Sequence, residues 1–123
     1  MQKTVNMNKL SQFIVPFFAL TLNLTVYSCI IQNPKPEECE IVTTTISKIV
    51  GGTSYDIIFV DKGGDRYYIN RGIEQGLNLQ DLNALVLNKT VTLHLAKVLG
   101  GMATSEHIAQ LAVNDNIIFT EFN

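Results

Sequence analysis

Aromatic and guanidinium side chains gather in the segment between positions 55 and 71. Aromatic rings stack on flat or cationic ligand groups, and an arginine holds an anionic group through paired hydrogen bonds. The simpler alternative is that the tyrosines pack a core and the arginines are solvated, and adjacent Tyr67 and Tyr68 must face opposite sides of a strand. The side chains selected as candidate ligand-binding groups are Tyr55, Arg66, Tyr68 and Arg71.

No pattern of catalytic residues is visible beside this group. His94 and His107 are the only histidines, and we expect both to lie on the surface. A metal site needs several ligands at suitable spacing, which the sequence does not offer. Ser105, Glu106 and His107 are neighbours, but successive side chains on a strand alternate sides. We therefore expect a non-enzymatic protein with no catalytic residue, metal ligand or cofactor.

The first 28 residues have the three parts of a secretory signal. A polar start carries Lys3 and Lys9, an uncharged and mostly apolar run extends over residues 10–26, and small Ser28 precedes Cys29. Translation can begin at Met1 or at Met7, and the sequence does not decide between them. We expect export from the cytoplasm, with residues 1–28 as the signal peptide.

The end of this signal, Val26-Tyr27-Ser28-Cys29, resembles the lipobox of bacterial lipoproteins. Val26 and Ser28 match the aliphatic and small positions, whereas Tyr27 departs from the usual residue between them. The resemblance implies that Cys29 is diacylated and becomes the mature N-terminus. Residues 29–39, with two prolines and no apolar periodicity, would then be a lipid-anchored tether. It also implies location in the bacterial cell envelope, with the membrane as a partner through the anchor.

Two alternatives remain for the same segment. Ordinary signal cleavage would release a soluble protein, and Cys29 would then be able to bridge to Cys39 in an oxidising compartment. The uncharged stretch from Leu10 to Gln32 is also just long enough to cross a bilayer as an uncleaved helix, although Pro16 and Asn23 interrupt it.

The net charge of the mature chain argues against a nucleic-acid-binding function. The whole chain carries 9 basic and 11 acidic residues. Removing the leader takes Lys3 and Lys9 but no acidic residue, so the mature balance is 7 − 11 = −4. Nucleic-acid phosphates are held by lysines and arginines that displace counterions, so we expect no nucleic-acid partner.

Apolar periodicity predicts strands and one helix after the tether. Alternating or β-branched runs over residues 41–50, 55–60 and 66–70 predict a meander of three strands. Leu79, Leu82, Leu85 and Val86 recur at helical spacing behind Asn78, a favourable N-cap. Residues 90–97, 107–113 and 117–122 predict further strands.

This order resembles the OB-fold, a small Greek-key barrel with a helix between strands three and four. The resemblance implies a mainly β protein whose antiparallel barrel occupies residues 40–123, after an N-terminal signal helix. In OB-folds, the face of strands two and three binds oligonucleotides or oligosaccharides. Another small α+β domain with a mostly antiparallel sheet is the alternative architecture.

Together these observations lead us to expect an envelope lipoprotein whose barrel binds a protein or glycan partner. The first alternative is an envelope enzyme with a site assembled from separate strands. The second is a nucleic-acid-binding OB module, which would require a contiguous basic face containing Arg66, Arg71 and Lys97.

Overall fold

The structure is a computed structural model that describes residues 34–123. The predicted signal peptide and Cys29 lie outside these residues. No helix within the described residues has the length and apolar character needed to cross a membrane. The elements, in chain order, are η1 (Pro36–Glu38), β1 (Cys39–Gly51), η2 (Thr53–Tyr55), β2 (Ile57–Asp61), β3 (Arg66–Ile69), α2 (Leu79–Val86), β4 (Thr90–Val98), η3 (Leu99–Gly101), β5 (Ala103–Val113) and β6 (Asn116–Thr120).

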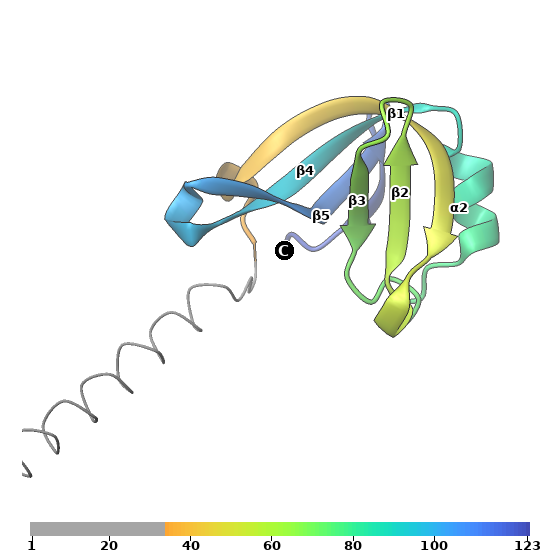
Figure 1. Ribbon diagram of the computed structural model, residues 1–123, viewed down its shortest axis with the longest axis horizontal. Coiled ribbons are helices and arrows are strands. Elements are labelled where there is room, and N and C mark those ends of the chain that lie inside the picture. Colours follow the sequence, from red (N-terminus) through yellow and green to blue (C-terminus); the bar gives the residue numbers. More distant parts are fainter. Residues whose placement is uncertain (1–33) are drawn as a thin grey trace, which may run out of the picture. The chain divides into compact units, whose positions relative to one another are not determined.

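The strands form a small closed barrel of five strands, consistent with an OB-like fold (Figure 1). The long strand β1 serves both halves: its first part pairs with β4 and its second part with β2. The pairing order is β3-β2-β1-β4-β5, and a parallel bridge between Tyr68 and His107 joins β3 to β5. The predicted mainly β barrel, with one helix between strands three and four, is confirmed.

A bulge allows β1 to change partners. The register with β2 shifts between Ile46 and Lys48, and such an irregularity bends a strand and increases its local twist. The hydroxyl of Ser47, at the bulge, lies 3.1 Å from the carbonyl oxygen of Val60 and can donate to it. β-branched residues supply most of this strand, and they favour the pleated conformation.

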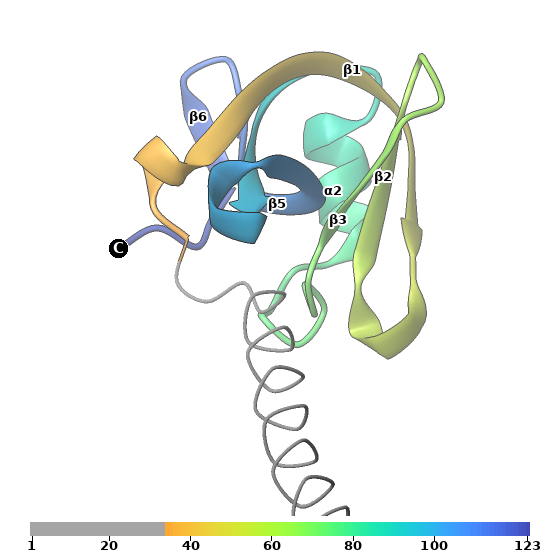
Figure 2. The ribbon, with the colours of Figure 1, turned by 60° about the vertical axis from the view of Figure 1, so that its left-hand side comes forward.

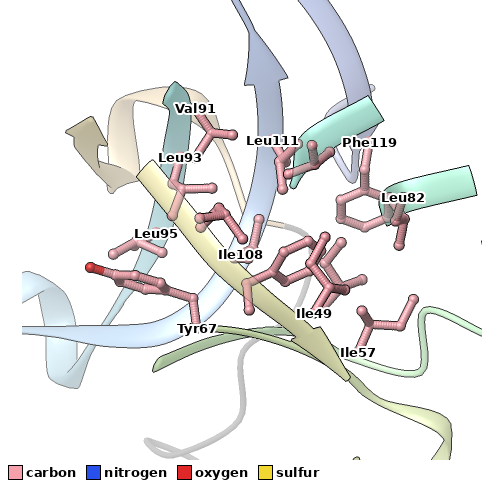
Figure 3. Close-up of a cluster of buried hydrophobic side chains, with 14 residues drawn as sticks. Ile49, Ile57, Tyr67, Leu82, Val91, Leu93, Leu95, Ile108, Leu111 and Phe119 are labelled. Atoms are coloured by element: carbon pink, nitrogen blue, oxygen red, sulfur yellow. The ribbon is translucent and has the colours of Figure 1, made fainter. Parts of the chain in front are cut away.

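The core lies inside the barrel and extends under the helix (Figure 3). Alternate residues of β2 and β4 point inward, including Phe59, Val91 and Leu93, which are fully buried. α2 lies against β1 (Figures 1 and 2) and adds Leu82 and Val86 to the core. The sixth strand, β6, pairs only with β5 and contributes buried Phe119.

The sequence predicted the start of α2 correctly. The Asn78 side chain accepts hydrogen bonds from the backbone amides of Gln80 and Asp81, at 2.7 and 3.2 Å. These bonds satisfy amide groups that the first helical turn leaves unpaired. The helix is only eight residues long, so its apolar contact with the barrel is what stabilises it.

Two local predictions were wrong. Tyr55 does not begin a strand: it ends the 3-10 turn η2 with a φ of 65°, and β2 starts at Ile57. His107 is not on the surface but is 6% exposed. The predicted tether ends in the 3-10 turn η1, which leads directly into β1 at Cys39.

Candidate functional site

A pocket of about 310 Å³ opens on the face formed by β2 and β3, which is the face that binds ligands in OB-folds. Its wall combines the loop between β1 and β2 with residues from three strands. The lining residues are Thr53, Asp56, Ile58, Arg66, Tyr67, Tyr68 and Glu106. It therefore offers two tyrosine side chains, a guanidinium group, two carboxylates and a threonine hydroxyl within one small space.

Two of the four candidate residues line this pocket, and two do not. Arg66 and Tyr68 lie on β3, two positions apart, so their side chains share the outer face of the strand. Tyr67, between them, turns inward and is buried. Tyr55 and Arg71 lie beyond the lining, and the Arg71 guanidinium instead forms an exposed ion pair with Glu74 at 3.4 Å.

Arg71 still contributes to the pocket through its backbone. Its amide donates a hydrogen bond of 2.8 Å to Oδ1 of Asp56, and the amide of Ile73 donates to the carbonyl of Tyr55 at 3.2 Å. These two bonds attach the segment after β3 to the loop after β1. Asp56 is thereby held at the pocket wall, a role that side-chain type alone did not reveal.

The pocket has an acidic character around its aromatic ring. Burial raises the pKa of the Tyr68 hydroxyl, and the nearby charges of Asp56, Glu106 and Glu121 raise it further. The phenol therefore stays protonated and able to donate a hydrogen bond at neutral pH. Arg66 is the one basic residue in the lining, and within residues 34–123 it forms no ion pair.

The sequence did not predict the contacts that link Tyr68 to His107 and His107 to Glu121. The Tyr68 and His107 rings meet edge to face, with centroids 5.5 Å apart and planes at 86°. Nε2 of His107 lies 2.9 Å from the carboxylate of Glu121. The three residues come from β3, β5 and the segment after β6, so only the folded barrel brings them together. The cross-strand pairing of Tyr68 with His107 is set by barrel closure, which leaves no signal in local periodicity.

The other histidine lies under the same segment. His94, on the outer face of β4, packs edge to face against Phe122 with ring centroids 5.6 Å apart. Its Nδ1 atom is buried without a hydrogen-bond partner among the described residues. Residues 121 and 122 thus cover both histidines, while neither histidine lines the pocket.

A second polar cluster lies inside the barrel, next to the pocket. The Asp61 carboxylate, 5% exposed, accepts hydrogen bonds from the hydroxyls of Thr44 and Tyr67 and from the amide of Asp65. Burial alone would raise the pKa of Asp61, but these hydrogen bonds outweigh it and hold the pKa below its ordinary value. The cluster anchors the turn between β2 and β3, which sets the start of the pocket strand at Arg66.

The Cys39 thiol, at the start of β1, has a raised pKa. Burial raises its pKa, and the charge of Glu38 raises it further. The Sγ atom lies 3.4 Å from the carbonyl oxygen of Lys35. A protonated thiol is a weak nucleophile, so the raised pKa lowers the reactivity of Cys39.

No protein-family model, curated protein or solved structure matches this chain. The class of protein therefore rests on the fold and the pocket. The described residues form a small, mainly β domain with a closed five-stranded barrel, and a mixed aromatic and charged pocket lies on its β2–β3 face.

Proposed function

We propose that this protein is an exported lipoprotein of the bacterial cell envelope, anchored through Cys29, whose barrel binds a glycan without catalysing a reaction. The observation that carries the binding function is the shared pocket of Arg66 and Tyr68. The ring of a tyrosine that lines a pocket, such as Tyr68, stacks on the apolar face of a sugar ring. Asp56, Glu106 and Thr53 accept or donate hydrogen bonds at sugar hydroxyl groups, and Arg66 suits an acidic substituent.

The size and exposure of the pocket support binding rather than catalysis. A volume of about 310 Å³ lies at the lower end of small-molecule sites and suits one or two sugar rings. Glu106 is exposed and Asp56 is partly exposed, whereas a catalytic acid is commonly buried to raise its pKa. The His107 ring stays behind Tyr68, bonded to Glu121.

The enzyme alternative has one observation in its favour. Asp56 and Glu106 come from separate elements and line one pocket, and paired carboxylates perform glycoside hydrolysis. Incubation of the protein with purified bacterial peptidoglycan, followed by an assay for new reducing ends, distinguishes glycan binding from glycan hydrolysis. Release of sugar that is lost in Glu106→Gln would favour the enzyme over the binding domain.

The binding proposal can be tested with purified bacterial peptidoglycan as the glycan probe. Full-length protein in detergent micelles is mixed with insoluble peptidoglycan, and the bound fraction is measured after sedimentation. We expect Tyr68→Ala to weaken binding by about tenfold or more, because stacking on an aromatic ring contributes on the order of 1–2 kcal/mol. Arg66→Ala should weaken binding to acidic fragments.

Tyr55→Ala and Arg71→Ala are matched controls. They remove the same two side-chain types from positions beside the pocket but outside its lining, so binding should change little. Equal losses in all four variants would contradict a site on the β2–β3 face. A pull-down from envelope extract is the complementary measurement. If the barrel recovers a specific protein but does not bind peptidoglycan, its partner is a protein and the glycan proposal is wrong.

A further inference from the structure

The loop between β4 and β5 exposes apolar side chains that the fold does not require. Met102 is 89% exposed and Leu99 is 50% exposed. Leu99 also has a φ of 55°, in the left-handed region that a non-glycine residue adopts at an energetic cost. The following Gly100 and Gly101 have positive φ as well, so the turn presents Leu99 and Met102 at its tip.

This tip lies at the end of the barrel where the chain enters. β1 and β4 are antiparallel, and their register pairs Cys39, the first residue of β1, with Ala96. β4 ends two residues later at Val98, and η1 lies against β4. Figure 1 shows the β4–β5 loop on the same side as the first described residues. A side-chain hydrogen bond from Thr104 to Glu40 ties the start of β5 to the start of β1.

The chain length limits how far this end can lie from the proposed anchor. Cys29 precedes Pro34, the first described residue, by five positions. Five residues span at most about 17 Å when fully extended. A lipid anchor at Cys29 therefore holds this end of the barrel, with Leu99 and Met102, close to the membrane surface.

The charges at this end favour apolar insertion over attraction to anionic lipid. Lys35 and Lys97 are offset by Glu37, Glu38 and Glu40, so the end lacks the basic cluster that binds anionic headgroups. Moving exposed leucine and methionine side chains from water into the interfacial region of a bilayer lowers the free energy.

We propose that the β4–β5 loop inserts Leu99 and Met102 into the lipid surface beside the Cys29 anchor. This inference rests on the anchoring part of the proposed function and adds a second membrane contact. Two attachment points fix the orientation of the barrel relative to the bilayer, whereas a single flexible tether leaves the barrel free to rotate.

The natural chain has no tryptophan, so Met102→Trp creates a single fluorescent reporter. The full-length variant is purified with its anchor and reconstituted into phosphatidylcholine vesicles, and flotation shows that the protein is bound. We expect its emission to shift to the blue and to be quenched when brominated phosphatidylcholine replaces the ordinary lipid. Leu99→Trp should behave in the same way and guards against a local effect of one substitution.

Ile117→Trp is the matched control. Ile117 is 56% exposed and lies in the β5–β6 hairpin, at the far end of β5. The eleven residues from Ala103 to Val113 are separated by ten steps along the strand, so that hairpin lies about 33 Å along the strand from the loop. Its emission should stay at the wavelength of a solvated tryptophan, without quenching.

The outcomes separate the two proposals. Failure to float would overturn the anchor and this inference together. Flotation with unquenched tryptophan at positions 99 and 102 would overturn loop insertion alone. Equal quenching at position 117 would also overturn it, because the contact would then not be specific to this end of the barrel.

Discussion

At the scale of single residues, Asp61 shows why a buried charge can be retained in a small barrel. Three hydrogen bonds converge on its carboxylate from β1, β3 and the β2–β3 turn. Asp61→Asn replaces one acceptor oxygen with a donor that faces those same donors. We expect a loss of about 2 kcal/mol in the free energy of unfolding at pH 7, measured by urea denaturation.

The same residue gives a pH dependence with a definite sign. The pKa of Asp61 is lowered in the folded state, so the unfolded state binds the proton more readily. Its stabilisation is present above the unfolded pKa of about 3.9 and is lost as the pH falls through the folded pKa. The difference between wild type and Asp61→Asn should therefore shrink below pH 4. A constant difference down to pH 2 would contradict the hydrogen-bonded carboxylate, and exposed Asp65→Asn is the control.

Tyr67 should give protein stability the opposite pH dependence, with a loss as the pH rises in the alkaline range. Burial, the charge of Asp61 and the hydrogen bond to it raise the Tyr67 pKa to about 12. An unfolded tyrosine ionises near pH 10, so the stabilisation is complete below pH 10 and is lost as the pH rises towards 12. Tyr67→Phe should be less stable than wild type by about 1 kcal/mol at pH 7. Its stability should decline less between pH 10 and 12 when unfolding is followed by circular dichroism.

Side-chain alternation predicted only part of the pocket. It correctly separated Tyr67 from Tyr68, because period-two geometry is local. It could not exclude Tyr55, since the positive φ of that residue ends a 3-10 turn and no apolar pattern marks such a turn. It also missed the burial of His107, which depends on Glu121 reaching back from beyond β6.

At the scale of elements, the connection between β3 and α2 depends on a buried glycine. A Cβ atom at Gly72 would lie 2.7 Å from Cδ1 of Ile57 and 3.1 Å from Cγ2 of Ile69. Both isoleucines are fully buried in the core, so neither has space to move. Gly72→Ala should lower the free energy of unfolding by about 1–3 kcal/mol, measured by thermal or urea denaturation.

Gly63→Ala is the control for this prediction. The nearest atom to a Cβ there is Oδ1 of Asp61 at 3.4 Å, and the turn is exposed. Neither glycine has positive φ, so backbone strain does not distinguish them. Gly63→Ala should change stability by no more than about 0.5 kcal/mol. Similar losses for both variants would mean that packing against Ile57 and Ile69 is not the cause.

The elements themselves were predictable where a local cause determines them. Asn78 marked the helix start because capping is a contact within one turn. The early start of β5 at Ala103 was not predicted, because Thr104 and Ala103 extend the strand only by pairing with the end of β4. Long-range pairing of that kind is decided by the barrel and not by the segment.

At the scale of the whole molecule, the barrel closes through a very short pairing between β3 and β5, which we call the seam. β1 pairs with β4 over seven registered residues, whereas β3 and β5 share the single bridge of Tyr68 and His107. The seam is supported from outside by Glu121, which bonds His107 and donates its amide to the carbonyl of Ala109 at 2.8 Å. Since Tyr68 also lines the pocket, closure of the barrel and the shape of the pocket are coupled.

Replacing the two histidines in turn tests this coupling. His107→Ala removes the ring behind Tyr68 and leaves the Glu121 carboxylate without its partner, which should cost about 2 kcal/mol or more. Amide hydrogen exchange should rise in β3 and in the first half of β5, while the β1–β4 pairing stays protected, and peptidoglycan binding should weaken. His94→Ala is the matched control, because it removes the edge contact with Phe122, on the order of 1 kcal/mol, and its Nδ1 atom has no hydrogen-bond partner among the described residues. Its β3 exchange and its binding should match the wild type. Uniform exchange across all strands in His107→Ala would show that the seam has no separate stability, and the pocket would then not depend on it.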